Sequence, residues 1–156
     1  MAVGNNSMRR SSNPKKFLSA EESQRLAAAI DHAENQTSGE IKVVILRHCW
    51  TDIRAKAARL FEKLNLNKTK QRNCVMIMLV LSNREFLIFG DQGIHEKVGQ
   101  GFWDDVRDVM SRKFAEDKFG EGLCEGVTTI GEKLARFFPR QQNDRNEIPD
   151  EVAYEE

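Results

Sequence analysis

Three apolar runs along the chain alternate with segments that have helical spacing, and together they predict a sheet covered by helices. The runs are IKVVIL, CVMIMLVL and EFLIF. Short apolar runs rich in β-branched residues are typical of strands, and a run without a polar position is typical of a strand buried on both faces. We therefore expect strands near 40–47, 74–81 and 85–90 in one sheet, with the 74–81 strand in its interior.

Helical periodicity fills the rest of the folded region. Ser19-Ala20-Glu21-Glu22 is a capping box, and it predicts a helix that continues to about Gln36. A second helix is expected over about 52–64, where apolar residues recur at helical spacing. The pattern becomes helical again from Gln100, and a last helix is expected over about 120–138.

The last predicted helix contains Gly122, Gly126 and Gly131. A glycine inside a helix costs about 1 kcal/mol relative to alanine, so three of them need a structural reason. We interpret them as positions where this helix packs closely on the sheet, with a short kinked helix as the alternative.

The order of these elements predicts an α/β fold with a central mixed sheet flanked by helices on both faces, a three-layer sandwich. A helical crossover between the first two strands makes them parallel, and the tight turn at 82–84 makes the third strand antiparallel to the second. The chain of 156 residues fits one domain, expected at 17–139. Residues 1–16 are expected to be a disordered tail, and 140–156 a polar tail anchored through Ile148, Val152 or Tyr154.

Charge and composition exclude several function classes. Lys and Arg together number 24, as do Asp and Glu, so the net charge favours no nucleic-acid partner. No apolar run is long enough for a membrane anchor, and the N-terminus lacks the apolar segment of a secretory signal. The three cysteines fit no zinc pattern. These features predict a cytoplasmic protein with reduced thiols.

Three polar stretches stand at the ends of the predicted strands. Thr37-Ser38-Gly39-Glu40 precedes the first, Gln71-Arg72-Asn73 precedes the second, and Gly90-Asp91-Gln92-Gly93 follows the third. With the first two strands parallel and the third antiparallel, all three stretches meet at one end of the sheet. The sequence therefore predicts a small polar site there.

Two carboxylates of this site, Asp91 and Glu40, are candidate ligands of a divalent cation such as calcium or magnesium, which prefers oxygen donors. Arg72, Asn73 and Lys70 are candidate anion-binding residues. Structural roles remain open beside these. Asp91 could be a turn residue held by Arg72, Asn73 could close a turn, and Glu40 could form a salt bridge to Arg72.

The residues quoted so far also carry a family resemblance. The chain resembles the TPM domain over about 17–139. The resemblance rests on five segments in this order: FLSAEES, LAAAIDHAENQTSGEIKVVI, FEKLNLNKTKQRNCVMIML, FLIFGDQGIHEKVGQGFWDDV and EGLCEGVTTIGEKLARFFP. The family is named after a thylakoid lumen protein, a photosystem II repair protein and a nematode receptor-modulating membrane protein. The resemblance implies an α/β sandwich, and it implies that acid phosphatase activity and divalent-cation binding occur in some members.

Two functional classes follow. The first is a non-enzymatic, cation-binding module that interacts with partner proteins. The alternative is a metal-dependent acid phosphatase-like hydrolase of phosphate monoesters, with Arg72 and Lys70 on the phosphate. The sequence has no nucleophile elbow, P-loop, CxxC pair or HExxH motif, and no evident general base, so the binding module is the preferred hypothesis and catalysis stays undecided.

Overall fold

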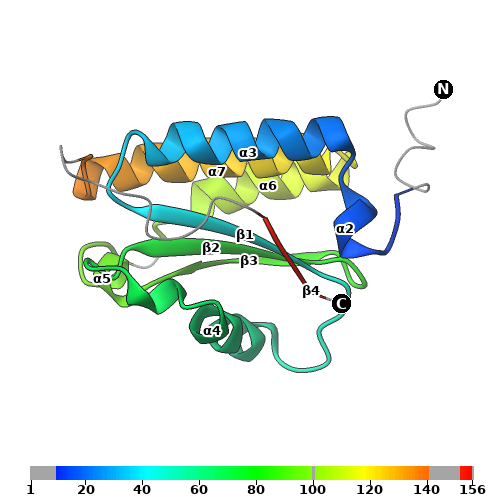
Figure 1. Ribbon diagram of the computed structural model, residues 1–156, viewed down its shortest axis with the longest axis horizontal. Helices are drawn as coiled ribbons and strands as arrows, with labels where there is room; N and C mark the ends of the chain where they lie inside the picture. Colours follow the sequence, from blue (N-terminus) through cyan, green and yellow to red (C-terminus); the bar gives the residue numbers. More distant parts are fainter. Residues whose placement is uncertain (1–9, 100, 141–151, 156) are drawn as a thin grey trace.

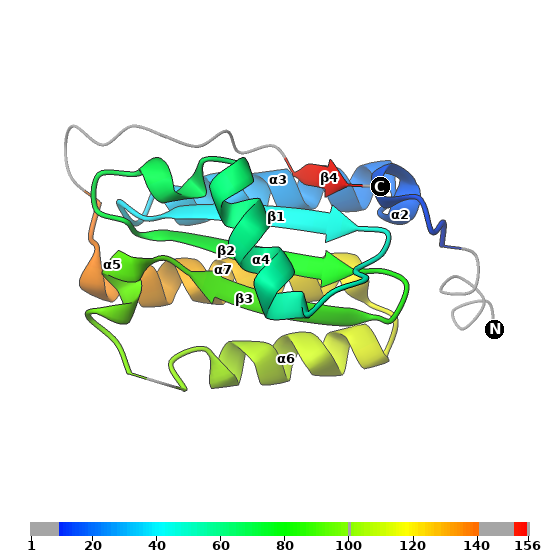
Figure 2. The same cartoon turned by 90° about the horizontal axis from the view of Figure 1, so that it is seen from below.

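A four-stranded mixed sheet forms the centre of the computed structural model, which describes residues 10–99, 101–140 and 152–155 (Figures 1 and 2). The strand order is β3-β2-β1-β4. The strands are β1 (Glu40–Leu46), β2 (Cys74–Val80), β3 (Glu85–Gly90) and β4 (Ala153–Glu155). β1 runs parallel to β2, and β3 runs antiparallel to β2, so the predicted directions and the interior position of the 74–81 strand are confirmed.

Helices cover both faces of the sheet, as predicted. They are α2 (Pro14–Phe17), α3 (Ala20–Glu34), α4 (Ile53–Lys63), α5 (Gln92–His95), α6 (Asp104–Ala115) and α7 (Phe119–Phe137), and a 3-10 turn, η1, spans Leu66–Lys68. In Figure 1, α3, α6 and α7 lie on one face and α4 on the other. Alternate residues of β1 and β2 enter two separate apolar clusters, one on each face, which gives the three-layer sandwich its two cores.

Side-chain caps start the two helices that flank β1. The Glu22 N–H donates to Ser19 Oγ at 3.1 Å, and the Ser19 N–H donates to Glu22 Oε1 at 2.9 Å. This is the predicted capping box. α4 begins after Asp52, whose carboxylate accepts a hydrogen bond from the Ala55 N–H at 3.0 Å.

The glycines of α7 do not face the sheet, so that interpretation is wrong. A Cβ on Gly126 would lie 2.5 Å from Met110 Sδ of α6, and one on Gly131 would lie 2.6 Å from Ala33 Cβ of α3. Gly122 likewise faces α6. The glycines let α7 fit closely between α3 and α6. This helix–helix packing explains why helix-destabilising glycines are present in α7.

Ordered structure begins before the expected domain boundary at residue 17. α2 is a helical turn capped by Asn13, and Arg10 reaches Glu22 of α3 through two hydrogen bonds of 2.9 and 2.8 Å. The Arg10 guanidinium also lies over the rings of Phe17 and Phe119. The expectation of disorder is therefore wrong for residues 10–16, and residues 1–9 lie outside the described part of the chain.

The C-terminal tail contributes β4, which pairs parallel with residues 44–46 of β1. Val152 and Tyr154 pack against the apolar cluster, as expected of anchors, whereas Ile148 lies outside the described residues. Lys63 of α4 forms an ion pair with Glu155 at 3.0 Å. Within the described ranges, no helix is both long enough and apolar enough to cross a membrane.

Candidate functional site

The strand register gathers the three polar stretches at one end of the sheet, as the sequence predicts. Glu40 lies opposite Cys74, the first residue of β2, and Val75 lies opposite Gly90, the last residue of β3. The Asp91 N–H then donates to the Cys74 carbonyl at 3.0 Å, so the chain leaves β3 beside the start of β2.

Arg72 and Asp91 form the central contact of this cluster. Arg72 Nε donates to Asp91 Oδ2 at 2.8 Å, and Arg72 Nη2 donates to Asp91 Oδ1 at 2.9 Å. Asp91 Oδ1 also accepts a hydrogen bond from the Gln92 N–H at 2.7 Å, which caps α5. Both carboxylate oxygens thus have charge-assisted partners. The hydrogen bonds to Asp91 raise the pKa of the Arg72 guanidinium, which stays protonated.

The backbone around Arg72 is shaped to make this contact. Arg72 has φ of 52°, in the left-handed region, and its carbonyl accepts a hydrogen bond from the Gly93 N–H at 2.8 Å. A Cβ on Gly93 would lie 2.0 Å from the Gln71 carbonyl oxygen, so only glycine fits there. The loop before β2 and the start of α5 therefore pack directly against each other.

Asn73 closes the other side of the cluster. It is buried, its N–H donates to Thr69 Oγ1 at 3.2 Å, and its side-chain amide donates to Ser38 Oγ at 3.4 Å. Its carbonyl accepts from the Glu40 N–H at 3.4 Å. These contacts are those of a residue that closes a turn, one of the two roles left open by the sequence.

Glu40 is 2% exposed and faces the same side of the sheet as Cys74, the side covered by α4. Burial raises the pKa of the Cys74 thiol well above its usual range, and the nearby carboxylates of Glu40, Asp91 and Glu34 raise it further. The positive charge of buried Lys42 acts in the opposite direction on this thiol. Lys70 differs from the other candidates because it is exposed and makes no ion pair with a described residue.

The residues present do not fit a preformed metal centre. In the ranges 10–99, 101–140 and 152–155 there is no group of three or more His, Cys, Asp or Glu side chains placed to hold one ion. Both oxygens of Asp91 already accept hydrogen bonds from the Arg72 guanidinium, so a cation there would have to share the carboxylate with a positive charge or displace it. The cation-ligand and anion-binding roles of these residues stay predictions.

Sequence reasoning missed three polar residues near the start of β1. Ser38 accepts hydrogen bonds from Gln71 and Asn73, although it appeared only within a quoted stretch. Glu34 is buried, and its carboxylate accepts from the Ile41 N–H at 2.9 Å. Lys42 is also buried. Glu34 follows Ile30 by four positions on the apolar stripe of α3, and Lys42 interrupts an apolar run, so both signals were visible.

Comparisons with known proteins agree on the family and the fold. The TPM domain model matches residues 11–133, a range that includes every candidate site residue. The NMR structure of BA42 protein from the psychrophilic bacteria Bizionia argentinensis is 34% identical, with a TM-score of 0.87 over 92% of this chain and 99% of that chain.

A second solved structure shows the fold alone. The N-terminal domain of a protein from P. gingivalis, solved by NMR, is 20% identical with a TM-score of 0.60, over 90% of this chain and 95% of that chain. The search of curated proteins found no match.

Proposed function

This chain belongs to the TPM domain family, and we propose that it acts as a binding module for partner proteins rather than as an enzyme. One observation carries this proposal. Both oxygens of Asp91, the best candidate for a ligand or a base, accept hydrogen bonds from Arg72. A cation or a substrate at Asp91 would have to compete with the positive charge of Arg72, which already bonds to both oxygens, so this carboxylate is not a free ligand.

A divalent cation enters this proposal only as a weak ligand. It must compete with Arg72 for Asp91, and few other carboxylates are placed to offset the dehydration of the ion. We therefore expect a dissociation constant nearer ~10⁻⁴–10⁻³ M, as in extracellular calcium modules, than that of a tight buffer.

Calcium titration followed by backbone NMR tests the competition directly. Arg72→Asn removes the guanidinium, and asparagine tolerates the left-handed backbone at this position. The variant should bind calcium more tightly than wild type, with the largest shifts at residues 90–96. Asp91→Asn should weaken binding more than Glu40→Gln, because the Asp91 loop also supplies backbone oxygens. If no amide at 90–96 shifts at millimolar calcium in wild type or Arg72→Asn, calcium binding is not part of the function.

Hydrolysis of an aryl phosphate separates the proposal from its alternative, a metal-dependent acid phosphatase-like hydrolase of phosphate monoesters. Exposed Lys70 beside Arg72 is the feature that favours this alternative. We expect no turnover of p-nitrophenyl phosphate with calcium, magnesium or manganese. Turnover that is lost in Asp91→Ala would overturn the binding proposal, whereas turnover that survives in Asp91→Ala would exclude the Asp91 site as its source.

The cellular setting remains part of the proposal. Cys49, Cys74 and Cys124 are free thiols, which supports the predicted cytoplasmic location. The partner is proposed to be a protein.

A further inference from the structure

The outer side of β3 is an open sheet edge. β3 is the last strand of the order β3-β2-β1-β4, whereas the opposite side of β1 is paired with β4 over residues 44–46. Because the Asp91 N–H points to Cys74 of β2, alternation along the antiparallel pair directs the backbone groups of Phe86, Ile88 and Gly90 away from β2. No other segment in the described part of the chain hydrogen-bonds to them.

β3 lacks the usual devices that keep an edge strand from pairing. Its sequence, EFLIFG, has no proline, no lysine and only one charge, at its first residue. Its N–H and C=O groups are a ready template for another strand. The strand has six residues, about 20 Å at the usual rise, which is long enough for an added segment of five or six residues.

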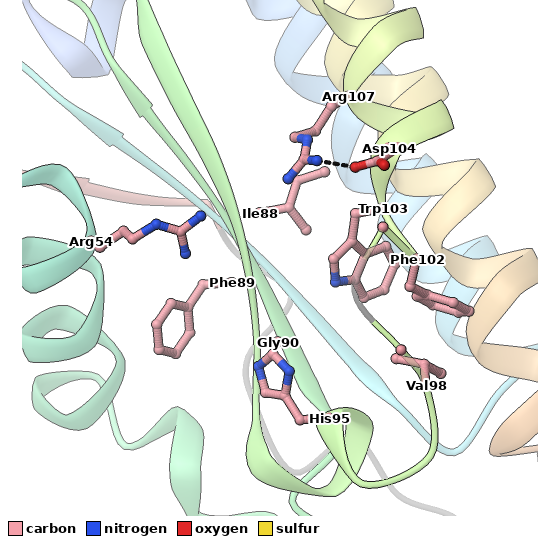
Figure 3. A pocket seen from close by; sticks show the side chains of 12 residues that line it. Arg54, Ile88, Phe89, Gly90, His95, Val98, Phe102, Trp103, Asp104 and Arg107 are labelled. Atoms are coloured by element: carbon pink, nitrogen blue, oxygen red, sulfur yellow. Dashed lines mark hydrogen bonds and ion pairs between the residues drawn. The ribbon is translucent and has the colours of Figure 1, made fainter.

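A cavity of about 750 Å³ lies along this edge (Figure 3). Ile88, Phe89 and Gly90 of β3 line its floor. Arg54 of α4 stands on one side of the strand, and residues of the α5–α6 connection and of α6 stand on the other. The volume lies within the range of ligand sites in proteins, about 300–1,000 Å³.

The two walls of this cavity differ in chemistry. Arg54 reaches toward the strand in Figure 3 and makes no hydrogen bond or ion pair with a described residue. The opposite wall has the apolar surfaces of Phe102 and Trp103. Arg107 on that side is already bonded to Asp104. The charged group of the cavity that makes no ion pair with a described residue is therefore a cation, the Arg54 guanidinium, which lies beside the outward N–H and C=O groups of β3.

From these observations we propose that the outer edge of β3 receives an extended segment of a partner protein by strand addition, with an acidic side chain against Arg54. The segment's side chains alternate, so those on one face meet Arg54 and those on the other face meet Phe102 and Trp103. An alternating segment with a central carboxylate and apolar neighbours on the opposite face matches both walls. This inference rests on the proposed role as a binding module and names the surface and the kind of partner.

A second copy of this chain is a poorer occupant. Pairing two β3 edges would bring two copies of the cationic Arg54 to one interface and would supply no carboxylate for either, and like charges across a new sheet interface are destabilising. Concentration-dependent protection of the edge would show this self-pairing and would overturn the proposal.

Amide hydrogen exchange of the whole, free protein tests the open edge first. The amides of Phe86, Ile88 and Gly90 should exchange much faster than those of Leu87 and Phe89, because only the latter two point to β2. If all five amides are equally protected at low protein concentration, the edge is already covered and the proposal fails.

Peptide titration followed by NMR tests the occupant. The probe is the blocked heptapeptide Val-Thr-Val-Glu-Val-Thr-Val, compared with versions that carry Lys in place of Glu or N-methyl groups at alternate residues. The Glu peptide should shift and protect the Phe86, Ile88 and Gly90 amides at millimolar concentration, and the other two should bind more weakly. No shift at these amides, or equal binding of the N-methylated peptide, would overturn strand addition.

Arg54→Ala measures the charge contribution. It should weaken binding of the Glu peptide about two- to fivefold, the range of a partly exposed ion pair, and should not weaken binding of the Lys peptide. Arg59→Ala is the matched control, because Arg59 is an exposed arginine of the same helix that bonds to Thr51 outside the cavity. Equal loss in both variants would remove the role of Arg54. Peptide binding at β3 and phosphatase turnover are measured separately. A lack of peptide binding therefore rejects strand addition at β3, whereas turnover that depends on Asp91 rejects the proposed function.

Discussion

Replacement of Glu22 by glutamine should change how the stability of the protein depends on pH. Glu22 accepts two hydrogen bonds from Arg10, and these bonds, with the positive charge behind them, lower the pKa of Glu22 from 4.5 to about 2 despite partial burial. Its pKa is depressed in the folded state, so the pair stabilises the fold fully above about pH 4.5. That contribution is lost as the pH falls from about 4.5 toward 2.

The magnitude follows from the pKa of the carboxyl and from its exposure. Lowering a pKa from 4.5 to about 2 corresponds to about 3 kcal/mol of unfolding free energy. The carboxylate remains partly open to solvent, so screening reduces this to about 1–2 kcal/mol. Glu22→Gln keeps a side-chain acceptor for the Ser19 N–H, so the capping box remains, whereas the charge and the acceptor for Arg10 Nη2 are removed.

Urea unfolding of wild type and Glu22→Gln over the range from about pH 7 to pH 2.5 is the assay. The variant should be less stable by about 1–2 kcal/mol near pH 7, and the difference should shrink toward zero as the wild-type carboxyl is protonated. Glu21→Gln is the matched control, since Glu21 is an exposed neighbour paired only with exposed Arg25. A Glu22→Gln difference that stays constant with pH would refute the reasoning, because it would show that the cost is not linked to the charge.

Two further predictions concern packing and thiol chemistry. Gly131→Ala should destabilise by about 1–3 kcal/mol in thermal or urea unfolding, because its Cβ would lie 2.6 Å from the Cβ of Ala33, which cannot rotate away, and Ala33→Gly should restore part of the loss. A thiol reagent added to the native protein should modify Cys49 well before Cys74, as read by mass spectrometry, because burial raises the pKa of the Cys74 thiol. Equal modification rates, or a stable Gly131→Ala variant, would contradict these two arguments.

The strands and their directions could be predicted because each is encoded locally. A run without polar residues, as in β2, has only one stable place in a sandwich, and the lengths of the connections then determine parallel or antiparallel pairing. The meeting of Glu40, Asn73 and Asp91 at one end of the sheet follows from that topology without any knowledge of side-chain contacts.

The contacts that the sequence did not predict are long-range or depend on backbone conformation. Arg10 finds Glu22 only because the N-terminal arm folds back on α3, and β4 pairs with β1 across more than a hundred residues. Neither contact is marked by a local periodic pattern in the sequence. The choice of Arg72 between Asp91 and an outside anion depends on its left-handed backbone and on the close approach of Gly93, which the residue types alone do not reveal.

The polar end of the sheet and the open edge of β3 are joined by one short element, α5. Its N-cap is Asp91, held by Arg72, and its last residue, His95, lines the cavity beside β3. A ligand that breaks the Arg72–Asp91 ion pair would change the contacts of Asp91, the N-cap of α5. A segment added to β3 would contact His95 of α5 and the connection that follows it. If α5 couples the two sites, each ligand alters the affinity of the other by the same factor. On the proposed function, the Arg72–Asp91 pair supports one wall of the binding surface at β3.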